Sequence, residues 1–141
     1  MSIATRWMDN DSYGHVNNVV YYSYFDTVVN EHLINVGGLD IRADPVIGVV
    51  VETRCLFHES LSFPETIDAG LRVTRLGRSS VTYDIGLFRQ NLDTPAATGH
   101  FVHVWVDRHG QRPAEIPPRI RAALEALQMP ADRESAMRDA P

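Results

Sequence analysis

The strongest hydrophobic pattern in the chain starts at Asn17 or Asn18 and stops before Gly37–Gly38. Its side chains recur at i, i+3 and i+4, which is the spacing of an α-helix. They are Val19, Val20, Tyr22, Phe25, Val28, Val29, His32, Leu33 and Val36. Asparagine is a favoured N-cap and glycine a favoured stop, so the pattern predicts a helix of about 18 residues, or roughly 27 Å. Because the apolar residues fill more than one stripe, we expect the helix to be largely enclosed.

Most of the remaining chain alternates apolar and polar residues with the period of two that is typical of strands. A short strand is expected up to Trp7, and Gly77-Arg78 and Asn91–Pro95 are expected turns. The predicted strands after the helix are Val46–His58, Ile67–Thr74, Val81–Arg89 and Phe101–Val106, and a short amphipathic helix follows Pro117–Pro118. This order predicts an α+β fold with a mostly antiparallel sheet, as one domain over residues 1–128, and a fraying tail over 129–141. One helix covers one face of a sheet, so the other face and the edges favour self-association.

Composition and charge narrow the possible functions. A length of 141 residues suits one domain, and a net charge of −5 argues against electrostatic binding of nucleic acid over a broad surface. All 13 basic residues are Arg, which excludes Schiff-base lysine chemistry and a Walker-type lysine. The one cysteine, Cys55, excludes an internal disulfide framework. No segment resembles a secretory signal or a membrane span, so we expect a cytoplasmic protein without a membrane partner.

The densest group of polar residues lies directly before the predicted helix. It runs Asp9-x-Asp11-x-x-Gly14-His15-Val16-Asn17-Asn18. One interpretation is an ordinary loop whose polar residues cap the helix. The other is a catalytic site for acyl transfer. There a carboxylate attacks or activates water, and the free N–H groups of the helix start stabilise the oxyanion.

The same residues carry a resemblance to a known family. The stretch TRWMDNDSYGHVNNVVYYSYFDTV resembles the N-terminal signature of the 4-hydroxybenzoyl-CoA thioesterase family, D-x-D-x-x-G-H-V-N-N with Tyr three residues on. Three further stretches, FHESLSFPETIDAGLRV, RLGRSSVTYDIGLFR and HVWVDRHGQRPAEIPPRIRAALEAL, are similar to later parts of that family. The resemblance spans about residues 5–127. It implies the hotdog fold, in which an antiparallel sheet of about five strands wraps a long central helix, and it implies homodimers or homotetramers.

The resemblance also implies roles for single residues. Asp11 matches the catalytic carboxylate, and Asn18 matches the position whose backbone N–H polarises the thioester carbonyl. His15 and Asn17 match positions that line the same corner, and Tyr21 matches an aromatic residue on the buried helix face. A loop that approaches CoA in relatives is matched by Gly77, Arg78, Ser79 and Ser80. From the residues alone this loop is also a simple hairpin turn, although Arg is a suitable partner for phosphate.

These implications point to an acyl-CoA thioesterase that needs no cofactor and no metal, with CoA or an acyl carrier protein as acyl donor. Asp11 would act as nucleophile or as general base, and the sequence leaves both open. The alternatives are a hotdog-fold enoyl-CoA hydratase or dehydratase that uses His15, and a non-enzymatic acyl-CoA or acyl-carrier binding module. Tyr21, Phe25, Phe57 and Phe63 are candidates for the acyl pocket, although no acyl group can be inferred from them.

Other candidate residues are expected to be structural. Cys55 lies in a predicted strand with no activating neighbour and is expected to be an inert core residue. His100 and His103 lie three apart on a strand and should point to opposite faces, which disfavours a shared metal. Trp7 and Trp105 are expected in the core.

Overall fold

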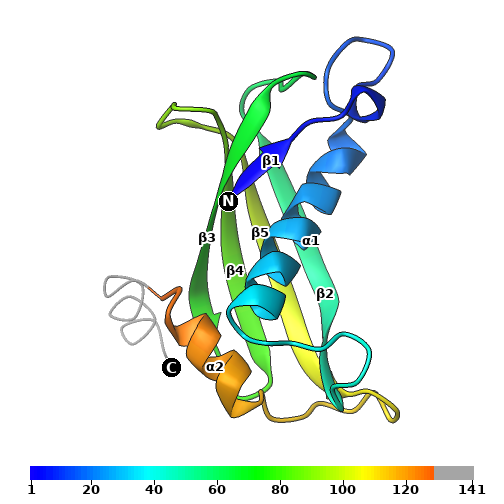
Figure 1. Ribbon diagram of the computed structural model, residues 1–141, viewed down its shortest axis with the longest axis vertical. Coiled ribbons are helices and arrows are strands. Elements are labelled where there is room, and N and C mark those ends of the chain that lie inside the picture. The colour runs from blue at the N-terminus through cyan, green and yellow to red at the C-terminus, as the bar shows by residue number, and fades with distance from the viewer. Residues whose placement is uncertain (129–141) are drawn as a thin grey trace.

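A single antiparallel sheet curls around a long helix in the computed structural model (Figure 1), which describes residues 1–128. The strands are β1 (Ser2–Ala4), β2 (Val46–Phe57), β3 (Thr66–Leu76), β4 (Ser80–Arg89) and β5 (Pro95–Asp107). They are ordered β1-β3-β4-β5-β2, and every neighbouring pair is antiparallel. The helices are η1 (Trp7–Asp9, a 3-10 turn), α1 (Asn18–Asn35) and α2 (Pro118–Glu125). This is the α+β arrangement that the resemblance implies; the predicted tail, 129–141, lies outside the described residues.

Helix α1 has the predicted length of 18 residues. The side chain of Asn17 caps it, because its Oδ1 accepts a hydrogen bond from Val19 N at 3.1 Å. The middle of the helix approaches the sheet closely at Gly99, where a Cβ would lie 2.6 Å from the ring of Phe25. The expectation of a largely enclosed helix is wrong for the single chain. One sheet face buries one side of α1, and residues on the other side remain exposed, such as Val19 at 73%.

The strand pattern places alternate residues on the helix side and on the outer side of the sheet. His103 faces the helix and is 2% exposed, whereas His100 lies on the outer face beside Arg54, as the spacing predicts. Trp105 is fully buried as expected, but the expectation for Trp7 is wrong. Trp7 is 75% exposed because its backbone turns into η1, where its ring packs edge-on against Phe63 at 5.9 Å.

Strand β2 is an edge of the sheet: it pairs with β5 on one side, and within residues 1–128 no strand pairs with its other side. Its apolar side chains are exposed to an unusual degree: Val49, Val50, Val51, Leu56 and Phe57 are 37–65% accessible. The apolar run Phe101–Val106 is internal by contrast, because β5 pairs with both β4 and β2. A long apolar edge strand is a ready template for pairing with another chain.

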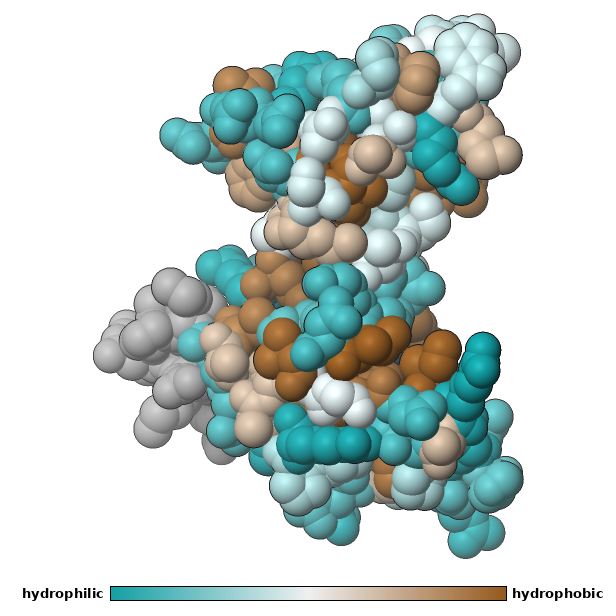
Figure 2. All heavy atoms as spheres, in the orientation of Figure 1, coloured by the Kyte–Doolittle hydropathy of each residue, from teal (hydrophilic) through white to brown (hydrophobic). Residues whose placement is uncertain are grey.

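Figure 2 shows the surface of the protein in the orientation of Figure 1. Its outline narrows at mid-height, and hydrophobic residues gather just below the narrowing (Figure 2). Within residues 1–128, no helix is both long and apolar enough to cross a membrane.

Candidate active site

The loop before α1 is held in a tight turn by its own backbone. Asp11 N donates to His15 O at 2.8 Å, and Gly14 N donates to Asp11 O at 3.1 Å. Gly14 has φ of +83°, a conformation that favours glycine. The Asp11 carboxylate accepts one hydrogen bond, from Tyr13 N to Oδ1 at 2.9 Å. Within residues 1–128, no group donates to Oδ2, so this oxygen is available to a substrate or a water.

The start of α1 offers a hydrogen-bond donor beside that carboxylate. Asn17 N donates to Asp9 O at 2.9 Å, Val19 N to the Asn17 side chain, and Val20 N to Asn17 O at 2.9 Å. In the described part of the chain, the backbone N–H of Asn18 has no acceptor. An unpaired N–H at the positive end of a helix is suited to an anionic oxygen.

A cavity of about 420 Å³ brings these groups together. It is lined by Asp11, Tyr13, His15, Val16, Asn18, Tyr21, Phe57, His58, Glu59 and Ser60. Four residues proposed from the sequence therefore share one site: Asp11, His15, Asn18 and Tyr21. Asn17 does not line the cavity; its side chain is used as the helix cap. Phe57, a candidate for the acyl pocket, lines the cavity as well.

Sequence reasoning assigned no role to five lining residues, Tyr13 and Val16 in the first loop and His58, Glu59 and Ser60 after β2. His58, Glu59 and Ser60 approach the helix start because β2 ends there, and no local sequence pattern reveals that placement. A polar FHES segment after an apolar strand was the available signal. His58 Nε2 lies 3.0 Å from Thr98 Oγ1, which orients its ring.

Tyr21 belongs to both the core and the cavity. It is 2% exposed, and its ring packs edge-on against Phe57 at 4.9 Å. Burial raises the pKa of its phenol, so it stays neutral at ordinary pH. Phe25 instead packs under Gly99, and Phe63 packs against Trp7, away from the cavity lining.

The first aspartate of the motif is an anchor rather than a cavity residue. Asp9 is 1% exposed and accepts hydrogen bonds from Arg6 N at 2.8 Å, from the Arg6 guanidinium at 2.9 Å and from Tyr24 OH at 2.8 Å. Burial alone would raise the pKa of Asp9, but these donors outweigh it and hold the pKa below its ordinary value. Asp9 thereby fixes η1 to α1 and sets the position of the loop that carries Asp11.

Asp9→Asn is expected to destabilise the fold by about 1–3 kcal/mol, because charge-assisted hydrogen bonds to a buried group are weakened. The folded-state pKa is lowered, so the stabilisation by Asp9 is present above the ordinary value of 3.8 and is lost as pH falls through the lower folded value. Urea unfolding at pH 7 and near pH 3 measures both effects. Tyr24→Phe, which removes one donor, should cost less; an Asp9→Asn protein as stable as the wild type would contradict the anchor role.

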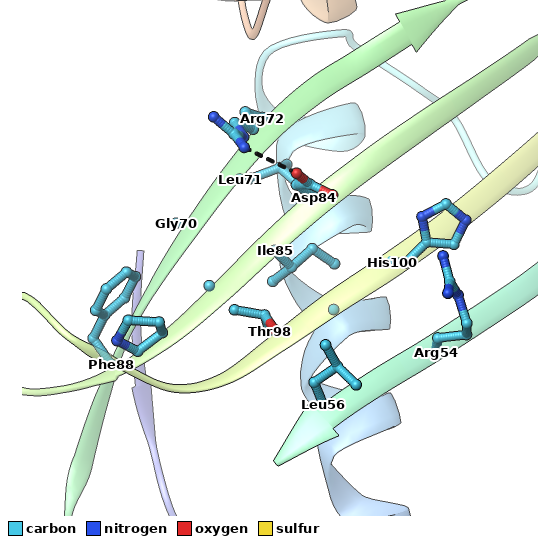
Figure 3. Close-up of a pocket in the computed structure, with 13 residues that line it drawn as sticks. Arg54, Leu56, Gly70, Leu71, Arg72, Asp84, Ile85, Phe88, Thr98 and His100 are labelled. Carbon is cyan, nitrogen blue, oxygen red and sulfur yellow. Dashed lines mark hydrogen bonds and ion pairs between the residues drawn. The ribbon is translucent and has the colours of Figure 1, made fainter. Parts of the chain in front are cut away.

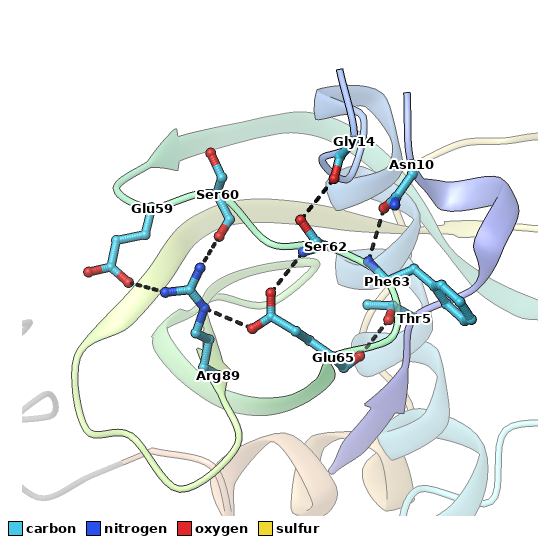
Figure 4. A network of polar contacts seen from close by, with 9 residues as sticks. All are labelled: Thr5, Asn10, Gly14, Glu59, Ser60, Ser62, Phe63, Glu65 and Arg89. Atoms are coloured by element: carbon cyan, nitrogen blue, oxygen red, sulfur yellow. Dashed lines mark hydrogen bonds and ion pairs between the residues drawn. The ribbon is translucent and has the colours of Figure 1, made fainter. Parts of the chain in front are cut away.

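A second network of hydrogen bonds and ion pairs stabilises the loop that carries Asp11 (Figure 4). Arg89 donates to Glu65 at 2.8 Å, to Glu59 at 3.1 Å and to the carbonyl of Ser60. The segment that it holds then bonds to the first loop. Ser62 Oγ donates to Gly14 O at 2.9 Å, and Phe63 N donates to Asn10 Oδ1 at 3.0 Å. The loop that carries Asp11 is therefore fixed by segments from two other parts of the chain.

The Gly77–Ser80 turn lies away from this cavity. Ser80 pairs with Val104 and Phe57 with Ala97, so the two places are seven residues apart along β5, or roughly 23 Å. Arg121 of α2 donates to Gly77 O at 2.7 Å, and the Arg78 side chain is exposed. One chain does not bring Arg78, Ser79 or Ser80 to Asp11, and their contact with substrate remains a prediction that needs a second protomer.

A larger hollow of about 700 Å³ lies on the outer face of the sheet, with α1 on the other side (Figure 3). Its lining includes Leu56, Phe88 and an ion pair between Arg72 and Asp84 at 3.0 Å. It contains no helix N-terminus and none of the motif residues. The smaller cavity is the candidate active site, because it holds a carboxylate and an unpaired N–H together. Within residues 1–128, no three His, Cys, Asp or Glu side chains gather closely enough to hold a metal ion.

Comparisons with known proteins identify the family of this chain. The family model of the thioesterase-like superfamily matches residues 5–124. The PA5185 protein from Pseudomonas aeruginosa is 53% identical with a TM-score of 0.90, and the match covers 92% of this chain and 90% of that one. The PA2801 protein of the same organism, described as a candidate thioesterase, is 31% identical with a TM-score of 0.80, over 87% and 95% of the two chains.

More distant structures share the fold. The Dynemicin thioesterase has 19% identity and a TM-score of 0.84 over 92% of this chain and 96% of that one. The SAV2348 protein from Staphylococcus aureus, solved in complex with CoA, has 15% identity and a TM-score of 0.82 over 90% and 81%. No curated protein gives a significant match. The chain belongs to the thioesterase-like superfamily, and it is a hotdog-fold thioester hydrolase.

Proposed function

We propose that this thioesterase hydrolyses acyl-CoA to a carboxylic acid and free CoA in the cavity at the start of α1. The observation that carries the proposal is that the Asp11 carboxylate and the unpaired Asn18 N–H line the same cavity. The CoA complex of the Staphylococcus aureus protein supports it in a general way, because it shows that this fold can hold CoA.

The thioester carbonyl oxygen would accept a hydrogen bond from Asn18 N–H, which stabilises the negative charge that develops on that oxygen. Asp11 would then act in one of two ways. As a base, it takes a proton from water while the water oxygen attacks the carbonyl carbon, and the C–S bond breaks as thiolate leaves. As a nucleophile, it forms a mixed anhydride with release of thiolate, and water then hydrolyses the anhydride. His15 lies in the cavity as a hydrogen-bonding side chain for either route.

A substrate panel tests this function. Purified protein is assayed for free thiol from acyl-CoA, acyl-pantetheine and acyl carrier protein thioesters, with hydration of enoyl-CoA followed in parallel. Thiol release without hydration supports the proposal. Hydration without thiol release supports the hydratase alternative, with His15 as the residue to substitute, and binding without either reaction supports the binding-module alternative.

We also propose that two chains pair along their β2 edges, so that two equivalent sites are built from both chains, and that two such dimers form a tetramer. The exposed apolar side chains of β2 support the pairing. Light scattering should give at least twice the 15.8 kDa of one chain. Val51→Asp places a charge on the edge and should lower the mass toward 15.8 kDa, whereas Leu92→Asp on the β4–β5 loop should not. A wild-type mass near that of one chain at micromolar concentration would contradict the dimer.

Arg78→Ala is expected to raise KM for acyl-CoA more than it lowers kcat, because a phosphate contact far from the thioester binds ground state and transition state alike. Acyl-pantetheine, which lacks the nucleotide, should show little change. Arg75→Ala is the matched control, since it removes a nearby exposed arginine of β3. Equal losses with both substrates would show that Arg78 is structural.

A further inference from the structure

The helix-facing side of the sheet contains three buried polar side-chain atoms that lack a partner within residues 1–128. They are Tyr83 OH, His103 Nδ1 and Trp105 Nε1. Buried polar atoms are hydrogen-bonded in most proteins, so such a group needs an explanation. His103 is 2% exposed, and burial lowers its pKa to about 4. Its imidazole is therefore neutral at pH 7 and offers one donor and one acceptor nitrogen.

His103 lines a cavity that the other two residues do not line. The cavity has a volume of about 200 Å³ and lies between the second half of α1 and the start of β2. Its walls are partly apolar, with Leu33, Leu39 and Ile47 among them, and partly polar, with Asn30, His103 and Arg108. Gly48 leaves room for the imidazole ring, because a Cβ there would lie 3.1 Å from His103 Nδ1.

The other polar groups of this cavity already have partners. The Arg108 guanidinium donates to Asp44 O at 2.7 Å and to Ile41 O at 2.9 Å. The Asn30 side chain donates to Asp26 O at 2.8 Å. His103 therefore supplies a buried polar atom of this cavity that has no partner within residues 1–128.

Both cavities adjoin β2, but at opposite ends. Phe57, the last residue of β2, lines the catalytic cavity, and Ile47 and Gly48, near its start, line the second cavity. A two-fold antiparallel pairing of two β2 edges sets the start of one strand beside the end of the other. In such a dimer, the His103 cavity of one protomer lies next to the catalytic cavity of its partner.

We propose that the His103 cavity receives the distal end of the acyl group, and that His103 hydrogen-bonds an uncharged polar atom there, a hydroxyl or a keto oxygen. The inference rests on the proposed function and names its substrate class: acyl thioesters with a neutral polar group near the far end of the chain. A cationic tail is disfavoured, because the Arg108 guanidinium lines the same cavity and the His103 imidazole is neutral.

The test compares ω-hydroxyacyl-CoAs with unsubstituted acyl-CoAs of the same chain lengths, as a ratio of kcat/KM. The wild type should prefer the hydroxylated member by about tenfold at the best length, the scale of one buried hydrogen bond. His103→Phe should abolish or reverse this preference. Tyr83→Phe is the matched control, because it removes another unpartnered buried group that does not line the cavity, and it should leave the ratio unchanged.

Gly48→Ala provides a second variant that keeps the imidazole. Its methyl group presses on the His103 ring, so it should reduce the ratio even if His103→Phe does not fold. Calorimetric binding of a non-hydrolysable ω-hydroxyacyl-CoA thioether should weaken in the same variants. An unchanged ratio in both variants, with hydrolysis still dependent on Asp11, would overturn the inference alone. Absence of thiol release from every acyl-CoA would instead overturn the proposed function.

Discussion

Asp11→Asn is expected to lower kcat for thiol release by at least ~10²-fold, the scale of losing a general base. Asparagine keeps the size of the side chain and can still accept the hydrogen bond from Tyr13 N, so the loop should keep its shape. The substitution removes the negative charge and basicity that either catalytic route requires. Steady-state kinetics with the best acyl-CoA measures the loss, and circular dichroism and thermal unfolding show that the fold is retained.

Asp26→Asn is the control for that variant. Asp26 is an exposed carboxylate on α1 and does not line the cavity that holds Asp11. Its substitution should change kcat by no more than a few tenths of the wild-type kcat. Near-normal hydrolysis by well-folded Asp11→Asn protein would refute the role of Asp11 in both forms, nucleophile and base.

Asn18→Pro is expected to lower kcat by about 10²–10³-fold, the usual effect of removing one oxyanion donor. Proline lacks the backbone N–H, yet it is well tolerated at the first position of a helix. The preceding residue, Asn17, already has φ of −62° and ψ of 137°, the extended conformation that a following proline requires. The variant therefore removes the proposed oxyanion donor while the helix can still form.

Asn18→Ala separates the backbone from the side chain. It keeps the N–H and loses the amide group, so its kcat should stay within about tenfold of the wild type, while Asn18→Pro falls much further. If the two variants lose activity equally, the side chain rather than the backbone N–H is the functional group at this position.

The sequence predicted those parts of the fold that depend on local periodicity. The 18-residue helix and four of the five strands show clear spacing in the apolar residues. The bounds of the helix and of β2, β3 and β4 agree closely with the structure, whereas β5 starts at Pro95, six residues before the predicted Phe101. What failed depends on tertiary pairing. Trp7 was expected in the core from its residue type, and only the turn of its chain into η1 exposes it. One side of α1 is exposed because a single sheet can bury only the side of the helix that packs against it.

Only part of the site was predictable from the sequence. Asp11, His15 and Asn18 are close in sequence and meet in one cavity. His58 and Glu59 were not predicted, because only the placement of β2 brings them to the helix start. The different roles of the two motif aspartates also required the structure: spacing cannot show that Asp9 is buried against Arg6 and Tyr24 while Asp11 stays accessible.

The central claim is that Asp11 and the Asn18 N–H act on the same thioester carbonyl, and a double-mutant cycle on thiol release tests it most directly. The measurement is kcat/KM for one acyl-CoA with wild type, Asp11→Asn, Asn18→Pro and the double variant. Because groups that stabilise one transition state act as a unit, the double variant should be about as slow as the slower single variant. A double variant whose loss equals the product of the two single losses, or two single variants that both hydrolyse the acyl-CoA at the wild-type rate, would contradict the claim.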